Sequence, residues 1–271
     1  MTRKLPIFFH IPKCAGTYAY NTLFRVVKTY ICPPLEIRSI IVTRGEYILY
    51  RLSCLPKANL NDNYKNPDDR WTYYVDYDDL NLDDLNLFFV EVCARSFNDY
   101  KNYIYNHLPE GVEPYEFIFL REPYSLAVSL YNYLNSDKSN HEPTNKSFNF
   151  NAFTDYLNSP RLQGSWLIHN LLNIPDPVPI TRDHFNDICK VLDNMLVSDL
   201  TNVDSTILKV CKDCYGLDNI ELNNVAKSRI KYNKNECGQD IFFDSLDEET
   251  KAHFLRHTKW DRELYNKYAK C

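Results

Sequence analysis

The sequence predicts an α/β fold: a single domain, residues 1–271, with a central and mainly parallel β-sheet flanked by helices. Two patterns indicate this class. Short apolar runs rich in β-branched or aromatic residues are bounded by turn residues, and apolar residues at helical spacing lie between those runs. A third observation concerns the domain count: the 271 residues show no linker or shift of composition, and 44% of them are hydrophobic, enough for one large core.

The apolar runs are expected to form buried parallel strands, because they are short and nearly continuous. They cover residues 5–11, 37–42, 85–92, 116–120 and 195–197. The helices are predicted from apolar residues that follow i, i+3, i+4, i+7 and bury one face. These sets are Tyr20, Leu23, Phe24 and Val27; Leu126, Leu130, Tyr133 and Leu134; and Phe185, Ile188, Cys189, Leu192 and Leu196. In such a fold a ligand binds at the carboxyl ends of the strands.

The C-terminal region predicts a closing pair of helices, residues 246–257 and 260–268. Ser245 and Glu248 have the spacing of a capping box at the start of the first. Residues 135–151 show no apolar period and are expected to form a loop, either a flap over a substrate or a plain surface loop.

The composition excludes some functions. A net charge of −5 argues against a nucleic-acid binder with a strongly basic surface, so any anion must be held by a local cluster. Pro12 and Lys13 interrupt the first apolar run before it could serve as a signal peptide, and no later run approaches the roughly 20 apolar residues that span a bilayer. We therefore expect a cytoplasmic protein without a membrane partner.

The cysteines are expected to be reduced thiols, because their number, nine, is odd and their spacing irregular. Cys211 and Cys214 form a C-x-x-C motif, but no second pair has the spacing of a zinc site. They share a predicted helix face with Ile207, Leu208 and Tyr215. Buried thiols are thus favoured over a metal or redox site.

The stretch "HIPKCAGTY" has the outline of an anion-binding loop. Residues 12–17 form the turn between the first strand and a helix over residues 18–28, with Thr17 as the expected N-cap. The first backbone N–H groups and the helix dipole favour an anion, Gly16 lets the backbone approach it, and Lys13 adds a mobile charge. The alternative is an ordinary turn with a solvated lysine. The nucleoside-triphosphate loop needs Lys-Ser/Thr after its second glycine, and that order is absent.

A second element, "LREPYSLAVSLYNYL", follows about a hundred residues later. Arg121 ends a strand, and Pro123 stands at a first helical position. Ser125 and Ser129 are four residues apart and share one helix face. The guanidinium and a hydroxyl group can together bind a terminal phosphate. The alternative is a surface Arg-Glu pair beside two solvated serines.

Together the two motifs resemble those of sulfotransferases that use 3′-phosphoadenosine 5′-phosphosulfate (PAPS), most closely the carbohydrate sulfotransferases. Their patterns run His-Ile-Pro-Lys-Thr-Gly/Ala-Gly-Thr and Leu-Arg-(Asp/Glu)-Pro with a downstream serine. The resemblance implies a P-loop-like sulfotransferase fold. It assigns the 5′-phosphosulfate to the first loop and the 3′-phosphate to Arg121 and Ser129, while Lys227, Ser228 and Arg229 would belong to a late loop that closes over the nucleotide. The residues of the first loop are Lys13, Cys14, Ala15, Gly16, Thr17 and Tyr18.

The chain departs at Cys14 from the pattern that it resembles, which has threonine there. A hydroxyl contact would be lost there and a backbone N–H contact kept. The tail "HTKWDRELYNKYA" is similar to the C-terminal helix of the family, although the specific motifs cover only a small part of the chain.

The resemblance implies in-line sulfuryl transfer to a hydroxyl group of a sugar, glycan or small alcohol, without a metal. Lys13 would neutralise charge on the leaving oxygen. Glu91, at the end of a central strand, is the candidate general base, with pairing to Arg95 as the alternative role. The other candidates are His10, His107 and His169. Two rival functions remain: a catalytically silent module that binds 3′-phosphoadenosine 5′-phosphate (PAP), and a nucleotide-dependent kinase.

Overall fold

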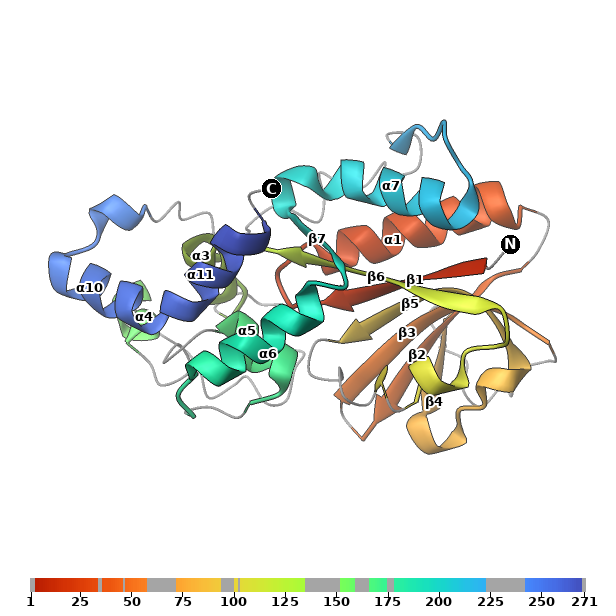
Figure 1. Ribbon diagram of the computed structural model, residues 1–271, viewed down its shortest axis with the longest axis horizontal. Coiled ribbons are helices and arrows are strands. Elements are labelled where there is room, and N and C mark those ends of the chain that lie inside the picture. Colours follow the sequence, from red (N-terminus) through yellow and green to blue (C-terminus); the bar gives the residue numbers. More distant parts are fainter. Residues whose placement is uncertain are drawn as a thin grey trace.

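The computed structural model describes residues 3–33, 36–45, 47–57, 72–93, 100–101, 103–134, 152–158, 166–174, 178–222 and 242–269. The α/β class is confirmed, because helices flank a seven-stranded, mostly parallel sheet in a single domain (Figure 1). The strands are β1 (Arg3–His10), β2 (Arg38–Arg44), β3 (Tyr47–Pro56), β4 (Thr72–Asp76), β5 (Leu85–Cys93), β6 (Val112–Leu120) and β7 (Leu196–Asp199).

The strand order is β4-β2-β3-β5-β1-β6-β7, which places β1 inside the sheet. β1 pairs in parallel with β5 and β6, and β6 with β7. Ile7, Phe8 and Phe9 are fully buried, as expected for a continuous apolar run covered on both faces. The carboxyl ends of these parallel strands therefore meet at one edge of the sheet.

The sequence prediction missed β3 and β4. β3 is antiparallel to both β2 and β5, and β4 is parallel to β2. Polar residues such as Arg51 and Ser53 break the apolar run of β3, although Tyr50 and Leu52 are buried. The rule for continuous apolar runs does not find a strand of this kind.

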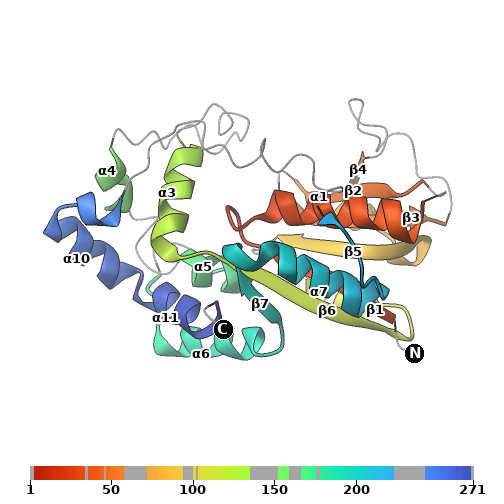
Figure 2. The same ribbon diagram turned by 90° about the horizontal axis from the view of Figure 1, so that it is seen from above.

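The helices lie in two groups. α1 and α7 cover one face of the sheet, and the others gather beyond the carboxyl ends of β1 and β6 (Figures 1 and 2). The α-helices are α1 (Gly16–Val26), α3 (Pro123–Leu134), α4 (Phe153–Leu157), α5 (Trp166–Leu172), α6 (Arg182–Leu192), α7 (Val203–Tyr215), α10 (Glu248–His257) and α11 (Lys259–Tyr268). A π-helical segment, η1 (Val27–Ile31), continues α1, and short 3₁₀ turns are η3 (Tyr77–Asp79), η4 (Leu82–Asp84), η6 (Tyr105–His107), η9 (Leu200–Asn202) and η10 (Phe243–Ser245).

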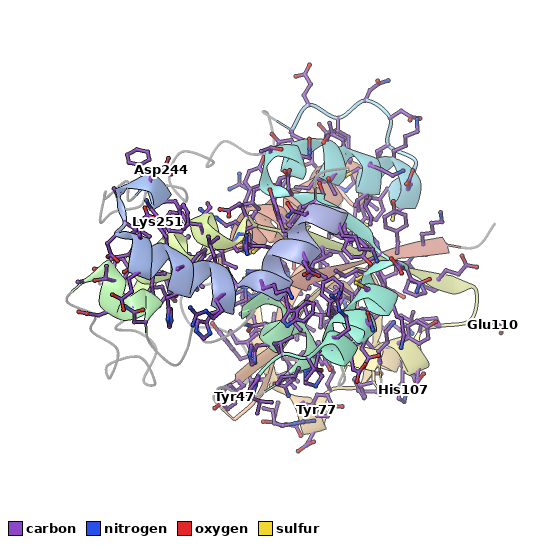
Figure 3. All side chains as sticks on the ribbon, turned by 60° about the vertical axis from the view of Figure 1, so that its left-hand side comes forward. Tyr47, Tyr77, His107, Glu110, Asp244 and Lys251 are labelled. Atoms are coloured by element: carbon purple, nitrogen blue, oxygen red, sulfur yellow. The ribbon has the colours of Figure 1, made fainter. Side chains whose placement is uncertain are left out.

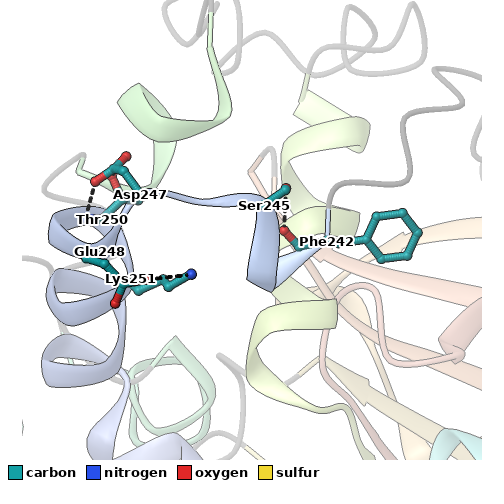
Figure 4. Close-up of polar contacts among 6 residues, drawn as sticks. All are labelled: Phe242, Ser245, Asp247, Glu248, Thr250 and Lys251. Carbon is teal, nitrogen blue, oxygen red and sulfur yellow. Dashed lines mark hydrogen bonds and ion pairs between the residues drawn. The ribbon is translucent and has the colours of Figure 1, made fainter.

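Two predicted helix boundaries were wrong. The helix that contains Phe185 ends at Leu192, and Leu196 opens β7 instead of extending the helical face. The N-cap of α10 is Asp247 and not Ser245: the Asp247 carboxylate accepts hydrogen bonds from the Thr250 N–H and hydroxyl groups, both at 2.8 Å (Figure 4). The Ser245 hydroxyl group instead donates to the Phe242 carbonyl at 2.6 Å.

Asp247→Ala is therefore expected to destabilise the protein by about 1 kcal/mol, the usual effect of losing an N-cap acceptor. Ser245→Ala is the matched control and should change the unfolding free energy by less than half as much. Urea unfolding of both variants measures this. Equal losses in the two would contradict the assignment of Asp247 as the cap.

Asp261 of α11 is a buried carboxyl group that joins α11 to α5. It is 2% exposed and accepts hydrogen bonds from the N–H groups of Leu167, at 2.7 Å, and Ile168, at 3.2 Å. Burial raises the pKa of Asp261 from 3.8 to about 7, and the two hydrogen bonds partly oppose the shift.

We expect Asp261 to make stability depend on pH. The folded protein keeps a proton that the unfolded chain releases, so the contribution is complete below pH 3.8 and is lost as the pH rises through about 7. The full shift corresponds to a loss on the order of 4 kcal/mol. We expect the unfolding free energy of the wild type to fall as the pH rises from 5 to 8, a window taken from this shift. The unfolding free energy of Asp261→Asn should depend less on pH over the same range. Parallel slopes would refute this role.

The described cysteines are free thiols, as predicted. Cys211 is fully buried in α7, and burial raises the pKa of both Cys211 and Cys214 to about 12. Leu208 is exposed, however, so it does not lie on the buried face with Ile207. Among the residues that the structure describes, no helix is long and apolar enough to cross a membrane.

Candidate anion site at the carboxyl end of the sheet

The loop after β1 turns tightly into α1. The Cys14 N–H donates to the Ile11 carbonyl at 3.1 Å, and Lys13 and Ala15 adopt left-handed conformations with φ of 68° and 58°. A left-handed residue followed by a helical one, as at Ala15 and Gly16, forms a concave row of N–H groups that suits an anion. The first bond of the α1 ladder runs from the Ala19 N–H to the Ala15 carbonyl, so the N–H groups of residues 16–18 precede it.

Thr17 is not the N-cap of α1, contrary to the prediction. The cap is Ala15, and it offers no side-chain hydrogen bond to the first turn. The helix begins at Gly16, two residues before the predicted start at Tyr18. A left-handed Ala15, which the sequence did not reveal, moves the start of the helix.

Gly16 packs against the imidazole ring of His10. A Cβ atom added to Gly16 would lie 1.9 Å from His10 Nε2, far inside van der Waals contact. From the sequence, Gly16 was expected to let the backbone approach an anion. In the structure the neighbouring histidine alone requires a glycine there.

Arg121 joins the two predicted motifs. Its Nη1 donates to the Lys13 carbonyl at 3.0 Å, and its Nε donates to the Ser125 hydroxyl group at 2.9 Å. The Lys13 ammonium group lies 4.5 Å from the centroid of the Tyr133 ring on α3. Residues more than a hundred positions apart thus form one cationic cluster at the carboxyl ends of β1 and β6.

The start of α3 is as predicted at Pro123, but the sequence analysis missed its cap. Glu122 accepts hydrogen bonds from the N–H groups of Tyr124, at 3.0 Å, and Ser125, at 2.7 Å. A carboxylate residue directly before a proline at the first helical position was the available signal. The N-terminus of α3 is therefore occupied, and the side chains of Arg121 and α3 must supply any anion contacts there.

Ser129 lies one turn beyond Ser125 and is 4% exposed. Asn132, which the sequence analysis did not single out, is 5% exposed, and within the described part of the chain its amide nitrogen has no hydrogen-bond partner. Positions 129 and 132 are neighbours on a helix surface. α3 therefore carries two polar side chains that are largely withdrawn from solvent.

Cys14 is fully buried, and burial raises the pKa of its thiol to about 12 although the positive charges of Arg121 and Lys13 oppose the shift. The thiol is therefore neutral. Its backbone N–H already donates within the turn, so the contact to an anion that was expected to survive at this position is not available. Tyr18 directs its hydroxyl group to Asp204 of α7, at 2.7 Å, and so ties α1 to α7.

Glu91 is buried in the sheet and is 1% exposed. Its Oε1 lies 2.8 Å from His10 Nδ1 and its Oε2 lies 3.5 Å from Arg51 Nε. Both distances are within the range of ion pairs, although His10 is charged only when its ring is protonated, and neither Glu91 oxygen accepts a hydrogen bond from the described residues. The alternative partner, Arg95, lies outside the described residues.

The other candidate bases lie elsewhere. His107 is in η6, before β6, and therefore at the end of the sheet opposite the loop; Figure 3 shows it near Glu110 and far from Lys251. His169 is buried in α5, with Nδ1 3.0 Å from the Ile174 carbonyl. Lys227, Ser228 and Arg229, and the segment 135–151, lie outside the described residues. No group of three or more His, Cys, Asp or Glu within the described ranges is arranged to hold a metal ion.

These observations define an α/β protein with a cationic loop at the carboxyl end of its central strand. Comparison with known proteins does not narrow that class further: no family model, no curated protein and no solved structure matches the chain.

Proposed function

We propose that the protein is a PAPS-dependent sulfotransferase of the P-loop-like type that acts on a hydroxyl group of a sugar, glycan or small alcohol. The observation that carries the proposal is the hydrogen bond from Arg121 to the Lys13 carbonyl. It brings the lysine loop and the arginine-serine helix into one cluster, as two-phosphate recognition of the donor requires.

The donor would lie with its 5′-phosphosulfate on the first turn of α1 and its 3′-phosphate towards Arg121 and Ser129. The N–H groups of Gly16, Thr17 and Tyr18 favour the first anion through the helix dipole. Arg121 supplies the planar donor group for the second. Lys227, Ser228 and Arg229 remain proposed contacts to the nucleotide.

Transfer would be an in-line displacement. The acceptor oxygen forms a bond to sulfur as the bond from sulfur to the 5′-phosphate oxygen breaks, and the acceptor proton passes to a base. Lys13 would stabilise the negative charge on the leaving oxygen, and the protein otherwise positions the two substrates.

The burial of Glu91 supports a second candidate function, a PAP-binding module without catalysis. A carboxylate that is 1% exposed cannot reach an acceptor hydroxyl group in this conformation. The kinase alternative has weaker support, because the lysine precedes the glycine in the loop.

The proposal is tested by incubating the protein with ³⁵S-labelled PAPS and a panel of glycans, sugars and small alcohols. Label transferred to at least one class of acceptor would support a sulfotransferase. If PAP binds but no acceptor in the panel is labelled, the binding module becomes the better account.

A further inference from the structure

We infer that Glu91 is a positioning residue that acts through His10, and that His10 fixes the start of α1 and so the geometry of the donor loop. The inference rests on the proposed function in one respect: it concerns the loop that would hold PAPS. It assigns Glu91 a role other than general base, and it gives His10 and Gly16 a joint role.

The first step is the burial of Glu91. Its cross-strand partners are Phe8 on β1 and Arg51 on β3, so the Glu91 side chain projects from the same face of the sheet as theirs. A buried carboxylate needs positive or polar partners. Arg51 and His10 are the ones that the described residues provide.

The second step is the fixed position of Arg51. Its guanidinium lies 5.6 Å from the centroid of the Tyr20 ring on α1. The hydroxyl groups of Tyr20 and Ser39 are hydrogen-bonded at 2.5 Å, which holds that ring in turn. The polar group around Glu91 therefore lies directly beneath α1, between the sheet and the helix that opens the donor loop.

The third step is the position of the His10 ring. One edge faces Glu91 through Nδ1, and one face stacks on Phe8 with the ring centroids 5.8 Å apart. The opposite edge, with Nε2, Cδ2 and Cε1, covers the position of a Cβ atom on Gly16. The ring is thus a spacer between the buried carboxylate and the first residue of α1.

The consequence concerns the first N–H groups of α1. Their direction depends on where Gly16 rests, and Gly16 rests on the ring. Displacement of the ring would move these donors, and shifts of about 1 Å at a reacting centre can lower rates about a hundredfold. Glu91 contributes by holding the ring, without touching either substrate.

A double-variant experiment tests the contact between His10 and Gly16 without any ligand. Gly16→Ala should lower the melting temperature, because the new methyl group overlaps the ring. His10→Ala removes the ring. In that background, Gly16→Ala should lower the melting temperature far less than it does in the wild type. Gly16→Ala without effect, or losses that simply add, would overturn the inference.

The role of Glu91 is tested by kinetics and PAP binding in the full-length protein. Glu91→Gln keeps the shape and should retain transfer within about tenfold, whereas loss of a general base lowers rates about 10²- to 10⁴-fold. Glu91→Ala should raise the Kd for PAP, and Gln should restore it. A rate lost in Glu91→Gln with unchanged Kd for PAP would make Glu91 the base and overturn the inference. Failure of the wild type to bind PAP would refute the proposed function and leave the stability experiment to decide the His10 contact.

Discussion

Lys13→Ala should lower the rate of sulfuryl transfer about 10²- to 10³-fold, the usual cost of removing one group that stabilises charge in a transition state. The fold should be retained, because the Lys13 side chain is only partly buried and its ammonium group lies over the Tyr133 ring at the edge of the sheet. The backbone carbonyl that Arg121 binds remains in the variant. Initial rates with labelled PAPS, together with the melting temperature, measure both effects.

Lys259→Ala is a matched control for this variant. Lys259 is also a lysine above an aromatic ring, 4.7 Å from the centroid of the Trp260 ring, but it is exposed and lies on α11 outside the loop. Its removal should leave the rate of transfer unchanged. Full activity in Lys13→Ala, or an equal loss in Lys259→Ala, would contradict the role given to Lys13.

Arg121→Ala is expected to affect both stability and donor binding. It removes the donors to the Lys13 carbonyl and the Ser125 hydroxyl group. Two hydrogen bonds from a charged group correspond to roughly 3 kcal/mol of unfolding free energy. Loss of the proposed contact to the 3′-phosphate should in addition weaken PAP binding about a hundredfold or more, since charge-assisted arginine contacts to phosphate are among the strongest hydrogen bonds.

Arg121→Lys separates the charge from the geometry. Lysine keeps the positive charge but cannot reproduce the fork that binds the carbonyl and the hydroxyl group together. Its Kd for PAP, measured by calorimetry, should fall between those of wild type and Arg121→Ala. A variant that binds as tightly as wild type would show that the fork has no part in recognition.

The parallel half of the sheet could be predicted because its strands are continuous apolar runs. β3 could not, since the polar residues Arg51 and Ser53 interrupt its apolar run, although Ser53 is fully buried. Arg51 lies opposite Glu91 in the register of β3 and β5. This pairing joins strands that are distant in sequence, so the role of Arg51 could not be predicted from its neighbours in the chain.

The part of the candidate site that lies directly after the strands could be predicted. Lys13 and Arg121 follow neighbouring parallel strands, so their proximity follows from the fold class. The contact between His10 and Gly16 was not predictable, because it depends on the left-handed Ala15, which starts α1 two residues earlier than predicted. Glu91 was expected at the end of a strand, yet β5 continues to Cys93, and the Glu91 carboxylate is buried.

The most direct test of the account is the binding of PAP to the full-length protein. It is measured as the change in melting temperature, with ATP and Mg²⁺ as the comparison ligand. A ligand at a hundred times its Kd stabilises the folded state by about 2.7 kcal/mol, which a melting curve detects readily. The account predicts that PAP raises the melting temperature, that ATP with Mg²⁺ does not, and that Arg121→Ala abolishes the shift. No shift with PAP, or a shift with ATP and Mg²⁺ alone, would contradict it.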